Sequence, residues 1–241
     1  MNMPADLTLR MNRTIAPFRK TVTLVASGSV VFVDDTFTDA DGTLIASHIG
    51  EVGATWTREY TFSDVNWEVQ GNALQEADYN GSSSDHYIHP SGIPPQMDYY
   101  VEAELVMAGV TNNVEFALLA RGYTVPDDGF GSSVEDGIEA YMLLGASSYS
   151  DLSGRWSGGG GSVSTALSVA DGSHIARLEV VGTTATLFYD GAQVNTQTVT
   201  GITGVTPAGF VDPGYVAMAI RAAALNDLGE VKVNYFRAGT L

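Results

Sequence analysis

The chain has 241 residues and a formal net charge of −17, and because it contains no cysteine, disulfides, thiolate chemistry and cysteine-based zinc sites are excluded. Its length is sufficient for one large β domain with a full hydrophobic core. Residues 34–241 are strongly acidic and therefore repel phosphate backbones and anionic lipids, so we expect neither nucleic-acid binding nor membrane binding.

The first 33 residues predict a basic N-terminal arm. They carry Arg10, Arg13, Arg19 and Lys20 against the single acid Asp6, with too few apolar residues for a core. We therefore expect an extended docking segment at 1–33, followed by one domain at 34–241. The start lacks a signal-peptide pattern, and no apolar run reaches the roughly 18 residues of a membrane span, which predicts synthesis in the cytoplasm.

The stretch "DDTFTDADGTLIASH", from Asp34 to His48, is rich in aspartate and follows a run of apolar residues. Calcium binds carboxylate and carbonyl oxygens in irregular loops, so Asp35, Asp39 and Asp41 are candidate calcium ligands. The stretch lacks the other ligands of an EF-hand loop, including the glutamate at position twelve. The alternative is a plain turn, in which aspartate side chains cap backbone N–H groups.

From residue 54 onward, apolar and polar residues alternate in short segments separated by Gly, Asn, Asp, Ser and Pro. In "YYVEAELVM", for example, Val101 and Leu105 lie on one face while Glu102 and Glu104 lie on the other. Strands are predicted at 54–60, 66–70, 73–76, 99–107, 114–121, 138–144, 175–182, 184–189, 193–200, 215–221 and 229–239. The dipeptide Asp190-Gly191 predicts a type I′ hairpin turn. About a dozen strands and no helix predict an all-β, two-sheet antiparallel sandwich.

The tract "SDLSGRWSGGGGSVST" contains four consecutive glycines, which predicts a loop. Trp156 beside this loop, with Tyr149 and Arg155, is the best candidate for an exposed platform on which sugar rings stack. Trp56 and Trp67 occupy core-like strand positions and are expected to be structural.

The sequence lacks the common catalytic patterns. No Glu-x-Asp-x-x-Glu segment of a glycoside hydrolase and no Gly-x-Ser-x-Gly elbow occur, and Glu102 with Glu104 is expected to be an exposed strand face. The four histidines, which are His48, His86, His89 and His174, are expected at the surface. We therefore expect a protein that is not an enzyme.

Seven segments of the chain resemble, in the same order, the concanavalin A-like or laminin-G-like jelly-roll domains. They are "DDTFTDADGTLIASHIGEVGATWTR", "NWEVQGNALQ", "YYVEAELVM", "FALLAR", "ARLEVVGTTATLFYDGAQV", "GYVAMAI" and "VNYFRAG". Such domains recur in bacteriophage virion proteins and in carbohydrate-binding modules. The resemblance covers residues 34–238 and implies a jelly-roll β-sandwich, in which a structural calcium near the first strand is common. The fold hosts lectins, glycanases, lyases and inert modules, so it does not specify function.

The resemblance, the basic arm and the acidic body favour a structural protein of a tailed-phage virion, as a capsid decoration, head fibre or tail component. Arg10, Arg13, Arg19 and Lys20 would then dock on other virion proteins, and a homotrimer is expected. The alternative is an adhesin that binds a host surface polysaccharide. A polysaccharide hydrolase or lyase is the third hypothesis.

Overall fold

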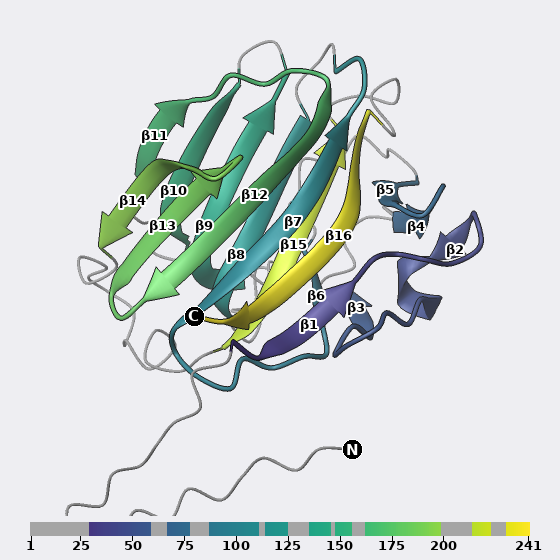
Figure 1. Ribbon diagram of the computed structural model, residues 1–241, viewed down its shortest axis with the longest axis horizontal. Coiled ribbons are helices and arrows are strands. Elements are labelled where there is room, and N and C mark those ends of the chain that lie inside the picture. The colour runs from purple at the N-terminus through teal and green to yellow at the C-terminus, as the bar shows by residue number, and fades with distance from the viewer. Residues whose placement is uncertain are drawn as a thin grey trace, which may run out of the picture.

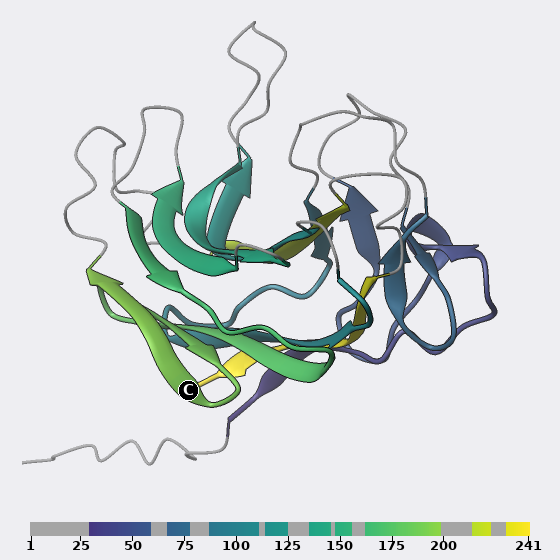
Figure 2. The ribbon, with the colours of Figure 1, turned by 90° about the horizontal axis from the view of Figure 1, so that it is seen from above.

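The computed structural model describes residues 29–58, 67–77, 87–110, 114–124, 135–145, 148–155, 162–198, 214–222 and 230–241. Within these ranges the chain forms two antiparallel sheets that face each other, as Figures 1 and 2 show. The fold is therefore the predicted jelly-roll β-sandwich.

Nine strands of the described residues form the first sheet, in the order β14-β13-β12-β7-β16-β5-β4-β2, with β1 also paired to β16. These strands are β1 (Val31–Asp35), β2 (Thr43–Leu44), β4 (Trp67–Val69), β5 (Leu74–Glu76), β7 (Tyr99–Met107), β12 (Gly172–Val181), β13 (Thr184–Tyr189), β14 (Ala192–Thr198) and β16 (Val231–Thr240). A short 3-10 helix, η1 (Ile45–Ser47), follows β2.

Seven strands form the second sheet within the same described ranges, in the order β11-β10-β9-β8-β15-β6-β3. They are β3 (Trp56–Arg58), β6 (Ile88–Pro90), β8 (Val114–Thr124), β9 (Glu135–Leu144), β10 (Tyr149–Arg155), β11 (Ser162–Ala166) and β15 (Tyr215–Ala222).

The alternating segments form half-buried strands, as predicted. In β7 every second residue from Tyr99 to Met107 is buried, because successive side chains of a strand point to opposite faces. The hairpin between β13 and β14 turns at Asp190 and Gly191, whose φ angles of 50° and 76° are the positive pair that a type I′ turn requires. Local sequence therefore sets both the strands and this turn.

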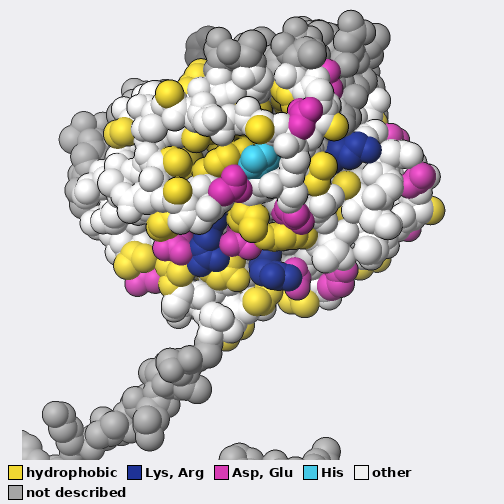
Figure 3. All heavy atoms as spheres, turned by 45° about the horizontal axis from the view of Figure 1, so that its top comes forward, with side chains coloured by type: hydrophobic (Ala, Val, Ile, Leu, Met, Phe, Trp, Pro, Cys, Tyr) yellow, Lys and Arg dark blue, Asp and Glu magenta, His cyan; other side chains and the backbone are white. Residues whose placement is uncertain are grey.

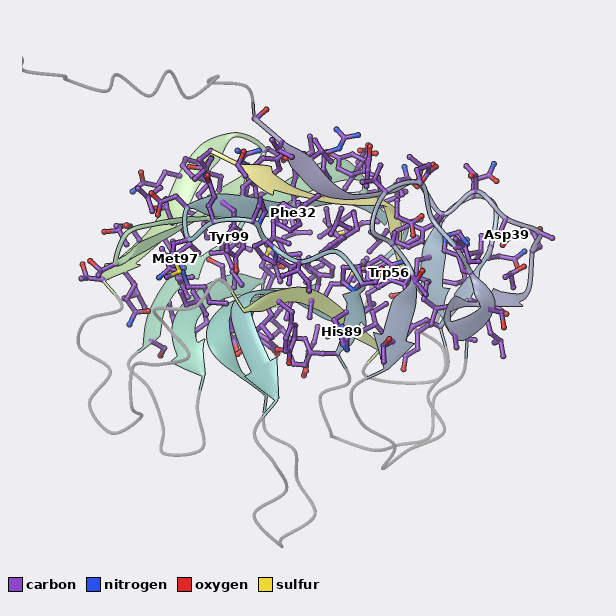
Figure 4. All side chains as sticks on the ribbon, turned by 90° about the horizontal axis from the view of Figure 1, so that it is seen from below. Phe32, Asp39, Trp56, His89, Met97 and Tyr99 are labelled. Atoms are coloured by element: carbon purple, nitrogen blue, oxygen red, sulfur yellow. The ribbon has the colours of Figure 1, made fainter. Side chains whose placement is uncertain are left out.

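One hydrophobic core lies between the sheets. Trp56 and Trp67 are both buried in it, as their strand positions predicted. Figure 4 shows Phe32, Trp56 and Tyr99 in the interior between the two layers, and the rings of Phe32 and Tyr99 meet edge to face at 5.8 Å.

The outer face of the nine-stranded sheet is polar, and its charges are paired. Arg177 donates to Glu102 at 3.0 Å and to Glu179 at 2.8 Å, while Tyr235 donates to Glu102 at 2.9 Å. Burial, together with this hydrogen bond, raises the pKa of Tyr235, so the phenol keeps its proton. Figure 3 shows acidic and basic side chains side by side on this face. Glu102 and Glu104 of β7 thus lie on the solvent-facing side of the strand, as expected.

The sequence places the domain boundary at Asp34. In the structure the sandwich begins slightly earlier, at the start of β1. Val33 and Asp34 pair with Ala238 and Arg237 of β16, and Val30 N–H donates to Thr240 Oγ1 at 2.8 Å. The start of the body and its last strand are therefore adjacent in the nine-stranded sheet. No helix among the described residues is long and apolar enough to cross a membrane.

Candidate glycan-binding face

The outer face of the seven-stranded sheet carries a polar contact between strands that are not neighbours. Tyr87, which directly precedes β6, donates its hydroxyl proton to Glu139 Oε1 of β9. In the sheet, β15 and β8 lie between these two strands, so a flat sheet would hold them about 14 Å apart. The side chains meet because they lie across the intervening strands and because the sheet curls, as Figure 2 shows.

Small residues make room for this contact. Ala117 of β8 with Ala217 and Ala219 of β15 forms a second apolar cluster on the outer face, together with Tyr87 and Leu119. Leu119 has no exposed surface although it points away from the main core. The centre of this face is therefore covered by side chains.

Tyr215 completes the cover over the centre. A side chain at Gly122 would place Cβ 2.7 Å from the Tyr215 ring, so the ring lies directly on the glycine backbone. The Tyr215 ring also packs against His89, with centroids 5.0 Å apart. Figure 4 shows His89 on the layer of the seven-stranded sheet. A ligand on this face would thus meet a closed surface at the centre.

The part of the same face formed by β9 and β10 is more open. Tyr149 is 36% exposed, and its ring lies 6.0 Å from that of Tyr141, centroid to centroid, at an angle of 44°. Asp151 pairs with Tyr141 across the two strands. It is half-buried, and its Oδ1 is enclosed without a hydrogen-bond partner. Two tilted aromatic rings and one unpaired acceptor therefore lie together.

The sequence identified only part of this arrangement. Tyr149 was predicted as a platform residue, whereas Trp156 and the side chain of Arg155 lie outside the described residues, as do Arg10, Arg13, Arg19 and Lys20. Asp151 was missed because β10 falls in a polar, glycine-rich tract that predicted a loop, and Tyr141 was missed because its strand had no predicted partner there. The alternation of Tyr149, Asp151 and Ser153 with Ser150 and Leu152 is the signal that could have revealed a strand there.

The aspartate-rich stretch forms a different kind of site, which is buried and structural. The Asp35 carboxylate has no exposed surface and accepts hydrogen bonds from Trp56 Nε1 at 2.5 Å and from the backbone N–H of Phe37 at 2.7 Å. His48 Nε2 lies 2.9 Å from Asp35 Oδ1. A side chain at Gly50 would place Cβ 2.3 Å from Asp35 Oδ2, so only glycine fits beside this carboxylate.

Each candidate calcium ligand already accepts a hydrogen bond from the chain. Asp35 is occupied by its own donors, Asp39 accepts from the backbone N–H of Ala40, and Asp41 accepts from the backbone N–H of Gly71 at 2.7 Å. The bond from Ala40, followed by the contact with His48, lowers the pKa of Asp39. Within the described ranges no three metal-ligating side chains gather. The three carboxylates thus act as acceptors for the chain itself, which is the predicted turn role.

The expectation of surface histidines is wrong for His48, which is buried between Asp35 and Phe37. Burial is possible because a carboxylate faces each ring nitrogen, with Asp39 Oδ2 3.4 Å from Nδ1. His174 lies at the start of β12 and contacts Asp190 at 2.8 Å. His86 lies outside the described residues.

Comparison with protein-family models finds no match, and comparison with curated protein sequences finds none either. Solved structures do match. A β-glucanase of Bacillus licheniformis is 15% identical with a TM-score of 0.53, over 90% of this chain and 100% of that chain. An endo-1,3-β-glucanase of Streptomyces sioyaensis is 16% identical with a TM-score of 0.55, over 91% and 99%.

A phage-encoded structure also matches. The CBM2 module of the evolved Dit of Lactobacillus casei BL23 phage J-1 is 8% identical with a TM-score of 0.60, over 88% of this chain and 95% of that chain. At these identities the comparisons establish the concanavalin A-like jelly-roll fold.

The expectation of a protein without enzymatic activity is contradicted by this comparison. Endo-glucanases, including the laminarinase catalytic domain of Thermotoga maritima, match nearly the whole chain. The expectation rested on the absence of linear catalytic motifs. Because a sheet face collects side chains from several strands, acids can share a face without such a motif, as Glu139 and Asp151 do on adjacent strands.

Proposed function

We propose that this protein binds a polysaccharide on the outer face of its seven-stranded sheet, at Tyr141, Tyr149 and Asp151. The supporting observation is the pair of tilted tyrosine rings beside an unpaired carboxylate oxygen. Aromatic faces stack on the apolar faces of sugar rings, and a neighbouring acceptor fixes a ring hydroxyl. The polysaccharide-degrading proteins among the similar structures support the same class of ligand.

The test is binding to a panel of polysaccharides, measured by affinity electrophoresis and by titration calorimetry. We expect Tyr149→Ala to weaken binding about tenfold, because stacking on one aromatic ring contributes about 1 kcal/mol beyond its buried area. The matched control is Tyr235→Ala, which removes a half-buried tyrosine from the opposite sheet face and should leave affinity unchanged. Equal affinity of wild type and Tyr149→Ala would reject this site.

Cleavage of the bound polysaccharide is a second candidate function. It is supported by the register of β9 and β10, in which Glu139 pairs with Ser153 and Tyr141 pairs with Asp151. Glu139 and Asp151 are therefore diagonal neighbours on one face, with Cα atoms about 7–8 Å apart. Side chains on diagonal neighbours can bring their carboxyl groups to the separation of about 5–9.5 Å that glycoside hydrolases use. New reducing ends in the binding incubations would support cleavage, and their absence with a bound polysaccharide would reject it.

We also propose that a phage virion carries this protein as a homotrimer, with the basic segment docked on other virion proteins. The phage module among the similar structures supports this context. The segment 1–28 leads into β1 of the nine-stranded sheet, so the candidate glycan-binding face lies on the opposite side of the sandwich. Mass spectrometry of separated heads and tails tests the location. Particles that retain a protein lacking residues 1–28 would contradict the docking role.

A further inference from the structure

Asp151 combines a partly exposed position with an unpaired carboxylate oxygen. It lies two residues after Tyr149 on β10 and directly opposite Tyr141 on β9, so its carboxylate borders both rings of the candidate platform. The residue is partly exposed, but its Oδ1 is enclosed and has no hydrogen-bond partner among the described residues. An enclosed polar atom without a partner is unfavourable, and such atoms are rare in folded proteins. Because Oδ1 is enclosed, a ligand donor removes that penalty only when the side chain rotates to expose this oxygen.

The net charge of residues 34–241 also disfavours anionic ligands. Residues 34–241 contain 27 of the 28 acidic residues but only seven of the 11 lysines and arginines, so their formal charge is −20. A charge of this size repels polyanions at long range and more weakly as salt increases. The Asp151 carboxylate adds a repulsion at contact distance, which salt screens less.

We propose that Asp151 is the specificity residue of this face and selects polysaccharides without anionic groups. It accepts hydrogen bonds from ligand hydroxyls and repels carboxylate or sulfate substituents placed on the Tyr141–Tyr149 platform. This inference rests on the proposed polysaccharide binding, and it adds the class of polysaccharide and the residue that determines it.

A matched pair of ligands tests the inference. The first is the uncharged polysaccharide that binds the wild type best in the panel, and the second is the same polysaccharide after carboxymethylation. We expect carboxymethylation to weaken binding to the wild type by about tenfold or more, at both 0.15 M and 0.5 M salt, because contact repulsion survives screening.

The diagnostic variant is Asp151→Asn, which keeps the shape and removes the charge. Its folding is checked by thermal unfolding, and since Oδ1 has no partner among the residues that the structure describes, the variant should be as stable as the wild type. We expect Asp151→Asn to bind the two ligands with affinities that differ by no more than about threefold. Tyr149→Ala serves as the second variant and should weaken binding to both ligands by the same factor.

The outcomes separate this inference from the proposed function. Wild-type protein that binds both ligands equally, with binding lost in Tyr149→Ala, overturns the inference and supports the binding face. If Asp151→Asn retains the full preference for the uncharged ligand, the net charge of residues 34–241 causes that preference. This result overturns the role of Asp151. Wild-type protein that binds no polysaccharide of the panel overturns the proposed function and the inference together.

Discussion

Replacing Asp35 with alanine is expected to lower the free energy of unfolding by about 3–5 kcal/mol. The fully buried carboxylate accepts from Trp56 Nε1 and from the backbone N–H of Phe37, and it faces His48. Alanine would leave these buried donors without an acceptor, and each unsatisfied group costs about 1–3 kcal/mol. The substitution also leaves a cavity beside Gly50, where the carboxylate excludes any side chain.

Chemical denaturation of the purified variant measures this effect. The matched control is Asp41→Ala in the same stretch, because Asp41 is exposed and accepts from Gly71 N–H and from Gln70 Nε2 at the surface. We expect the control to cost about 1 kcal/mol or less. Equal losses in the two variants would show that Asp35 is not the centre of a buried network.

Replacing Gly92 with alanine is expected to cost about 3 kcal/mol. Its added Cβ would lie 2.3 Å from the Phe32 carbonyl oxygen and 2.6 Å from Val33 Cγ2, both in β1. A backbone oxygen in a paired strand cannot move without disturbing that strand, so β1 would shift against β16. This result would show that the close approach of the 91–93 segment holds β1 in place.

The neighbouring Ile93 supplies the control for this prediction. It is 72% exposed, so Ile93→Ala should change stability by no more than about 0.5 kcal/mol in either direction. Midpoints of thermal and denaturant unfolding are compared for both variants. A Gly92→Ala protein as stable as Ile93→Ala would contradict the steric argument.

The strands of the sheets were largely predictable because their cause is local. Alternation in "YYVEAELVM" and "GEVKVNYFRAG" identified β7 and β16, and Asp190-Gly191 identified the turn between β13 and β14. Of the strands that the sequence missed, β10 and β11 lie in a tract rich in Ser and Gly, in which the apolar alternation is weak. Ser150 of β10 is buried because Asn195 of β14 donates to its hydroxyl at 2.9 Å, a contact that local sequence does not encode.

The sites were less predictable than the strands, because their members come from distant parts of the chain. The aspartate-rich stretch was ambiguous by itself, and the burial of Asp35 depends on His48 and Trp56, which lie 13 and 21 residues further along. Likewise, Tyr87 and Glu139 are 52 residues apart and meet only through the order of strands in the sheet. The calcium ligands and the surface histidines were expected without knowledge of these partners.

The sequence by itself determined the all-β class, the period-two strands and the acidic charge of residues 34–241, since each depends on composition or on neighbours within a few positions. Only the tertiary structure decided which side chains share a face. The register between β9 and β10 placed Asp151 beside Tyr141, and the packing of β1 against the 48–56 segment made Asp35 a buried acceptor. The physical reason is that register and sheet order are set by burial of the whole core, and a short stretch of sequence contains only part of it.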